Sequence, residues 1–175
     1  QQALQIFNKA LNAAGSISDD SDKAWALSNI VVELAKAGQF DKAFNAAGSI
    51  SDDSAKASAL KDIAVELAKT GQTQQALQIF DKAVDVAGSI SRDSSKASAL
   101  SGIVVGLAKA GQTQKALQIF DKAANVAGSI SNNYYKAWAL SIIAWRLAKA
   151  GQFDDALNVA GSICTDFYKD WAFRD

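Results

Sequence analysis

The chain has 175 residues, with 18 basic and 18 acidic side chains, one cysteine, and neither histidine nor proline. Its apolar content of 49% is enough to bury a core, which argues against a disordered chain. The net charge of zero argues against nucleic acid or an anionic membrane as the partner, because either would need a basic surface.

The composition also bears on the compartment. A single cysteine cannot form an intrachain disulfide, so nothing points to an oxidising environment. No apolar run reaches the ~18 residues of a membrane-spanning helix. We therefore expect a cytoplasmic protein without membrane contact. An upstream targeting segment stays open, because the chain begins with Gln1 and not with methionine.

The tetrapeptide AGSI divides the chain into units. It occurs at residues 14–17, 47–50, 87–90, 127–130 and 160–163, at intervals of 33, 40, 40 and 33 residues. Longer stretches repeat as well, since residues 71–91 and 111–131 differ at only three of 21 positions. Self-similarity at such a period is typical of helical repeat arrays.

The first segment of each unit, the A segment, predicts a helix. These helices are expected over residues 23–37, 56–70, 96–110 and 136–150. In the first of them Leu27, Ile30 and Leu34 recur at helical spacing. The expected N-terminal caps are Asp20, Asp53, Asp93, Asn133 and Asp166. The glycines expected to end the helices in a left-handed conformation are Gly38, Gly71, Gly111 and Gly151.

A second helix, the B segment, is predicted after each of these glycines and closes at AGSI. In the long units Ala76, Phe80 and Ala83 recur at spacings of four and three. The short units, residues 38–50 and 151–163, match the long ones without the heptad TQQALQI. We therefore expect one phenylalanine at an equivalent core position of every unit, namely Phe7, Phe40, Phe80, Phe120 and Phe153.

The seven-residue difference suits a helix. Seven residues at ~100° each turn a helix by about 700°, which is about 20° short of two full turns. Adding or removing a heptad therefore leaves the same face pointing at the same neighbours. If the heptad is helical, the B helices run long, short, long, long, short and differ in length by about 10 Å.

The spacing of large and small residues resembles the tetratricopeptide repeat (TPR) family. The matching positions of one unit are Leu60, Ile63, Ala64, Leu67, Gly71, Ala76, Phe80 and Ala83, and those of the next are Leu100, Ile103, Val104, Leu107, Gly111, Ala116, Phe120 and Ala123. This chain departs from the family pattern at three points. It has leucine where the family has aromatic residues in the first helix, and Gly88 or Gly128 where the family has a closing proline. Its period is 33 or 40 residues, whereas that of the family is 34. A related α-solenoid class stays open. The resemblance implies an all-α, right-handed solenoid of antiparallel helix pairs that binds proteins or peptides.

We expect one α-solenoid over residues 1–175, with about four A/B pairs and a partial unit at each end. The partial units are a B helix at residues 1–17 and the start of an A helix at residues 166–175. Neither end shows a polar capping unit, which indicates either a fragment of a longer array or a module that stacks end to end.

The residues for catalysis or for metal binding are missing. Without histidine there is no imidazole base, and Cys164 therefore lacks the partner that would activate its thiol. The acidic loops at residues 18–22 and 51–55 lack the ordered ligands of a calcium loop. AGSI follows a helix, whereas a phosphate loop follows a strand. We expect no enzymatic activity, no cofactor and no metal.

A second face of the A helices carries the candidate binding residues. In TPR-like solenoids this face lines the concave groove. Its predicted protein-binding residues are Trp25, Val32, Lys36, Lys61, Val65, Lys69, Val105, Lys109, Trp138, Trp145, Lys149 and Trp171. An apolar floor edged by lysines suits a peptide with an apolar face and some acidic groups. Burial of the tryptophans against the next A helix is the alternative.

Two functions follow from these observations. The first is a protein–protein interaction scaffold that binds a peptide or protein in the groove lined by the A helices. The alternative is a structural solenoid that self-associates end to end through its uncapped terminal repeats.

Overall fold

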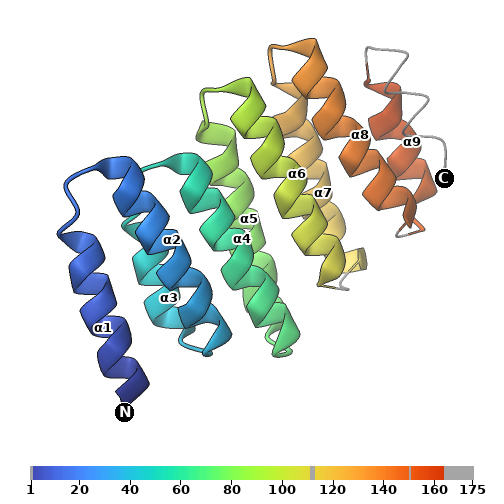
Figure 1. Ribbon diagram of the computed structural model, residues 1–175. Helices are drawn as coiled ribbons and strands as arrows, with labels where there is room; N and C mark the ends of the chain where they lie inside the picture. The colour runs from blue at the N-terminus through green and yellow to red at the C-terminus, as the bar shows by residue number, and fades with distance from the viewer. Residues whose placement is uncertain (1, 111–112, 150, 164–175) are drawn as a thin grey trace.

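A computed structural model describes residues 2–110, 113–149 and 151–163, and of these it gives the backbone alone at residues 2–3 and 113–117. All regular structure in these ranges is helical, and the nine described helices alternate between two layers (Figure 1). The expected all-α repeat solenoid is confirmed. No helix of the described ranges has the length and apolar character needed to cross a membrane.

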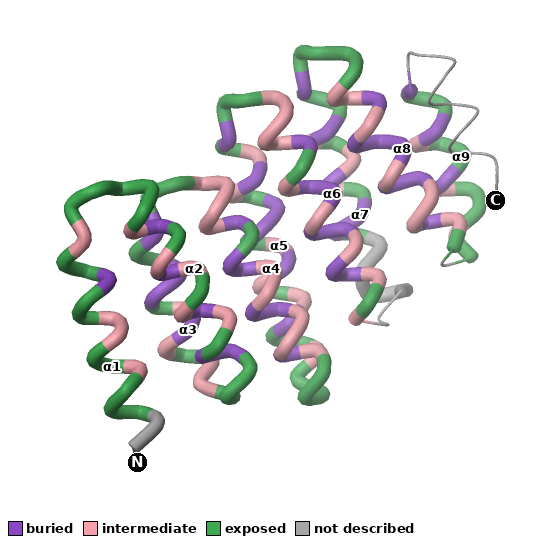
Figure 2. The backbone as a smooth tube through the Cα atoms, in the orientation of Figure 1, coloured by how far each residue is buried: buried purple, intermediate pink, exposed green. Residues whose placement is uncertain are grey.

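The A helices form one layer and the B helices the other. The A helices are α2 (Asp20–Lys36), α4 (Asp53–Lys69), α6 (Asp93–Lys109) and α8 (Asn133–Lys149). The B helices are α1 (Gln2–Gly15), α3 (Phe40–Gly48), α5 (Thr73–Ser89), α7 (Thr113–Gly128) and α9 (Phe153–Gly161). Each A helix packs on the next A helix and on the B helices beside it. The buried residues of Figure 2 accordingly recur along each helix where it meets its neighbours.

The N-terminal caps lie one residue earlier than predicted. The backbone N–H groups of Ser21 and Asp22 each donate to the carboxylate of Asp19 at 2.9 Å, and that of Ala55 donates to Asp52 at 2.7 Å. A cap residue has an extended backbone, which aims its side chain back at the free N–H groups. The residues expected as caps are instead the first helical residues Asp20, Asp53, Asp93 and Asn133, and Asp166 lies outside the described residues.

The start of α6 departs from this pattern. Arg92 stands at its N-terminal cap and makes no capping hydrogen bond with its side chain. The carboxylate of Asp93 instead accepts a hydrogen bond of 2.8 Å from the backbone N–H of Asn132, just before α8. One unit is thereby tied to the next, while Asn132 caps α8 through the N–H groups of Tyr134 and Tyr135.

The glycines after the A helices have the predicted left-handed conformation. Gly38, Gly71 and Gly151 have φ angles of 72°, 79° and 77°. The glutamine after each glycine donates its N–H to the carbonyl five residues back, as Gln39 does to Leu34 at 2.8 Å. This is the Schellman arrangement, which satisfies carbonyls that a helix end leaves free. Gly111 lies outside the described residues.

The B helices differ by a helical heptad, as predicted. α3 has 9 residues and begins at Phe40, whereas α5 has 17 residues and begins at Thr73, seven residues before Phe80. The same face is buried in both helices. Its fully buried alanines are Ala43 and Ala47 in α3 and Ala83 and Ala87 in α5.

The AGSI motif closes the B helices, and its isoleucine anchors the following loop. Ile50, Ile90, Ile130 and Ile163 are all buried, although they lie just beyond the helices. The glycines of the motif have no positive φ angle. The motif therefore anchors the end of the B helices through an apolar side chain, a role that the repeat pattern alone does not reveal.

The five equivalent phenylalanines are not all in the core. Phe80 and Phe120 are at most 1% exposed, and Phe7 and Phe40 are half-buried against the core. Phe153 is 66% exposed, so the prediction is wrong for this residue. The ring of Phe80 lies under α6, the next A helix. Phe153 is the first residue of α9, the last helix that the structure describes.

Gly106 lies where α6 packs closely against α4 and α5. A Cβ atom at this position would lie 3.1 Å from Cγ of Lys61, 3.2 Å from Cγ2 of Val65 and 3.3 Å from the ring of Phe80. Gly102, one turn earlier, has only the Cδ atom of Lys61 nearby, at 4.0 Å. Two glycines of the same helix thus differ in the space that a side chain would find.

This difference predicts opposite effects of the same substitution. Gly102→Ala is expected to raise the free energy of unfolding by about 0.5–1 kcal/mol, because alanine is the better helix former. The free energy of unfolding of the Gly106→Ala variant is expected to be about 1–3 kcal/mol lower than that of the Gly102→Ala variant, because Val65 and Phe80 cannot move aside without strain. Urea denaturation measures both values. Equal stability of the two variants would contradict the close packing at Gly106.

Candidate partner-binding face

The predicted binding residues lie on four consecutive A helices, which pack side by side in one layer. The three valines among them, Val32, Val65 and Val105, are half-buried. The exposed lysines are Lys36, Lys69, Lys109 and Lys149, whereas Lys61 is half-buried. Trp171 lies outside the described residues. The structure thus brings these side chains to one layer, and their role in binding stays a prediction.

The tryptophans of this face have different environments. Trp25 is 73% exposed. Trp138, at the equivalent position of its repeat, is half-buried and packs against the core. Trp145 is half-buried, and its ring centre lies 4.3 Å from the guanidinium carbon of Arg146. The repeat position alone therefore does not decide whether an indole is available to a partner.

Two hollows lie between neighbouring A helices. The first has a volume of about 560 Å³ and lies between α2 and α4, beside Trp25 and Asp62. The second, of about 430 Å³, lies between α4 and α6, beside Lys61 and Gly102. Hydroxyl groups line both, and Ser58 belongs to both. In the sequence the serines that line the hollows stand on the outward face of the A helices, Ser58 and Ser98 at one repeat position and Ser28 at another.

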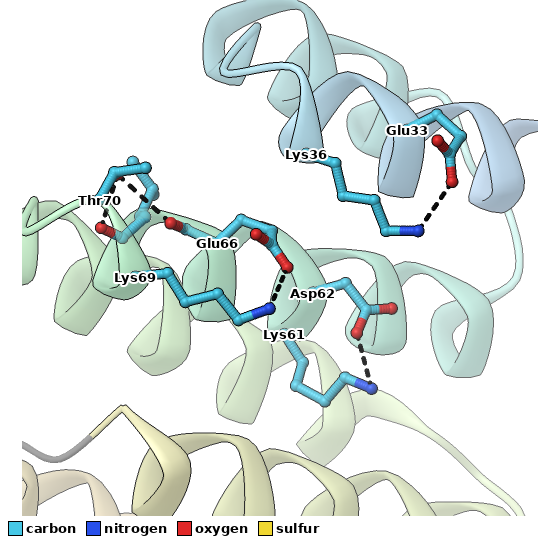
Figure 3. A network of polar contacts seen from close by, with 8 residues as sticks. Glu33, Lys36, Lys61, Asp62, Glu66, Lys69 and Thr70 are labelled. Carbon is cyan, nitrogen blue, oxygen red and sulfur yellow. Dashed lines mark hydrogen bonds and ion pairs between the residues drawn. The ribbon is translucent and has the colours of Figure 1, made fainter.

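Carboxylates neutralise several lysines of this face (Figure 3). The ammonium group of Lys36 lies 2.8 Å from a carboxylate oxygen of Glu33, and that of Lys69 lies 2.6 Å from Glu66. The hydrogen bond to Glu33 raises the pKa of Lys36. Such exposed pairs add little to stability. Their consequence is electrostatic, since they leave α2 and α4 without an excess of positive charge.

The charge of the face changes along the layer. One position of the repeat holds Glu33 in α2, Glu66 in α4, Gly106 in α6 and Arg146 in α8. Arg146 is half-buried, and burial lowers the pKa of its guanidinium group. Its buried Nε has no hydrogen-bond acceptor among the described residues. The α8 end of the face is therefore the basic end.

The opposite layer is held by a different set of charges. Lys122 of α7 contacts Asp81 of α5 at 2.7 Å and Asp85 at 2.8 Å. These hydrogen bonds raise the pKa of Lys122 against the opposing effect of burial. The contact ties two long B helices together.

Among the residues that the structure describes, no group of three side chains is placed to bind a metal ion.

Comparison with known proteins supports the helical-repeat architecture. A family model described as the PPR repeat matches residues 99–123, which span most of α6 and the first part of α7. No curated protein sequence matches the chain. The crystal structure of Ton1535 from Thermococcus onnurineus NA1 is similar, with 23% sequence identity and a TM-score of 0.55. The similarity covers 99% of this chain and 57% of that one.

At 23% identity the similarity to Ton1535 shows the fold alone, and this chain spans little more than half of that protein. The PPR repeat is related to TPR-like helical repeats, but its match does not confirm the TPR family itself. The chain is an all-α helical-repeat array, and residues 99–123 of it match the PPR repeat.

The different burial of two tryptophans predicts different costs of removing them. Trp138→Ala is expected to lower the free energy of unfolding by about 2–3 kcal/mol, because the substitution leaves a gap beside the core. Trp25→Ala is expected to change it by less than about 0.5 kcal/mol, since that ring is exposed. Urea denaturation followed by circular dichroism measures both. An equal loss in the two variants would show that Trp25 is also a packing residue.

Proposed function

We propose that the protein is a scaffold that binds a partner protein or peptide along the exposed side of its A helices. The observation that carries the proposal is the pair of hollows between α2, α4 and α6, the first of which is lined by the exposed ring of Trp25. Aromatic side chains beside a hollow supply much contact area for a partner. The half-buried valines of the same layer add an apolar floor.

RNA is the second candidate, and the PPR match favours it. PPR repeats typically bind RNA, with one base read by each helical repeat. This differs from the expectation that the protein binds no nucleic acid. At the α8 end, Arg146 and Lys149 lie beside Trp145, a combination of cations and a stacking ring that single-stranded RNA can use.

The charges of the remaining face favour a protein partner. RNA affinity comes largely from cations that neutralise phosphates. The ammonium groups of Lys36, Lys61 and Lys69 each lie within 2.9 Å of a carboxylate oxygen of their own helix. The chain as a whole carries no net charge. An RNA strand along this face would therefore meet carboxylates at α2 and α4.

Affinity capture from cell extract tests the proposal with two matched variants. The first changes one position of two A helices towards the basic end of the face, as Lys109→Glu and Lys149→Glu. The second changes one position of two B helices, as Lys42→Glu and Lys82→Glu. Both variants lose the same charge. We expect captured proteins to survive nuclease treatment and to disappear only with the first variant, as mass spectrometry of the eluate would show.

The same experiment separates the two candidates. Material that is removed by ribonuclease would favour RNA over a protein partner. Binding of a labelled single-stranded RNA would then weaken linearly with the logarithm of the salt concentration, with a slope of about −0.7 for each phosphate neutralised. Equal losses with the A-helix and B-helix variants would count against the A layer as the binding face.

End-to-end association remains an alternative because apolar side chains are exposed at both ends of the described array. Ile6 of α1 is 67% exposed, and Phe153 and Leu157 of α9 are 66% and 54% exposed. If these faces stack, the apparent mass from light scattering rises with concentration, and the double variant Ile6→Ser with Phe153→Ser abolishes the rise. A constant monomer mass across the concentration range would exclude this alternative.

A further inference from the structure

The hollow between α2 and α4 has an aromatic wall that is open to solvent. Trp25, 73% exposed, lines it together with Ser28 of the same helix. Across the hollow stands Ser58 of α4. No described contact holds the indole against the core, in contrast to Trp138. The ring is therefore available to a group that enters the hollow.

The other walls of this hollow are acidic. Asp20, Asp52 and Asp62 line it, and no lysine or arginine is among its lining residues. Asp52 also caps α4, and Asp62 also contacts the ammonium group of Lys61 at 2.9 Å. Asp20 has no such contact described. A group beside Trp25 thus meets carboxylates of two helices.

The next hollow provides an internal comparison, because it is built from the equivalent repeat positions. Where the first hollow has Trp25, the second has Ser58, and where the first has Asp62, the second has Gly102. The second hollow also contains Lys61 at the position equivalent to Ser28. The two hollows share their backbone design and differ in charge and in the aromatic ring.

The chemistry of the first hollow selects for positive charge. A cation over the face of an indole ring gains about 0.5–1 kcal/mol at an exposed site, and more where water is displaced. Neighbouring carboxylates attract the same cation and repel an anion. An ammonium or guanidinium group satisfies both elements of the hollow, whereas a phosphate or a carboxylate satisfies neither.

We propose that the hollow between α2 and α4 binds a lysine or arginine side chain of the partner, with the ring of Trp25 as its platform. The inference rests on the proposed binding of a protein or peptide, and it names the chemistry that this end of the face recognises. The charge complementarity extends to the whole layer, since the α8 end carries Arg146 and Lys149 and suits an acidic segment instead.

The test uses a peptide probe and substitutions that the chain itself contains at equivalent positions. The probe is a fluorescein-labelled peptide of glycine, serine and two arginines, and its control has citrulline, the neutral isostere, in place of arginine. Trp25→Ser introduces the residue of Ser58 and Ser98, and Asp62→Asn introduces that of Asn29. Ser95→Ala, which introduces the residue of Ala55, alters the second hollow alone and serves as the matched control. Circular dichroism melting verifies that each variant is folded.

We expect the arginine peptide to bind about tenfold more tightly than the citrulline peptide in fluorescence anisotropy titrations. Trp25→Ser is expected to weaken arginine-peptide binding by about threefold to tenfold although it leaves the charge unchanged. Asp62→Asn is expected to weaken it by about threefold. Ser95→Ala should bind the peptide as tightly as the unchanged protein.

Other outcomes overturn the proposal. Equal binding by Trp25→Ser would show that the indole is no platform and that the peptide is attracted by general charge. Equal binding of the citrulline peptide, or no binding of either peptide, would show that the hollow does not recognise cations. If Trp25→Ser has no effect while the double lysine variant of the A helices still loses captured proteins, this inference fails and the proposed function stands.

Discussion

The rotation of about 100° per residue along an α-helix is the constraint on which this array depends. Each helix buries its apolar face only against its neighbours in the two layers. A change of length must therefore return that face to the same direction. The difference between α3 and the long α5 meets this requirement, because it adds seven residues before Phe80 and keeps the alanine face buried. Insertion of five residues inside α5 would turn that face away from α4.

The packing within the A layer leaves other positions free to vary. Leucine and alanine fill core positions of every A helix, whereas the outward position of Trp25 is serine in α4 and α6. Gly106 is an exception with a packing cause, because Val65 and Phe80 occupy the space of its side chain. The repeated backbone thus makes similar hollows, and single substitutions give each hollow its own charge and shape.

The repeat, the glycine turns and the helical heptad could be predicted from the sequence because they depend on local spacing. The caps were misplaced by one residue because Asp19 and Asp20 offer the same chemistry, and only the backbone conformation decides which one faces the free N–H groups. The exposure of Phe153 and of Trp25 depends on the helices beside them. Phe80 and Trp138, at the equivalent positions, are covered, so no pattern within one unit could distinguish the exposed residue from the covered one.

The gradient of charge along the A layer connects the fold to the choice of partner. RNA presents the same negative charge at every nucleotide, so a face that reads it along its length needs cations throughout. Here Glu33 and Glu66 occupy the position that Arg146 holds at the other end, and the PPR match covers only the unit of α6 and α7, between those ends. A polypeptide can carry opposite charges a few residues apart. We therefore expect a partner segment that places its basic residues at α2 and α4 and its acidic residues at α8.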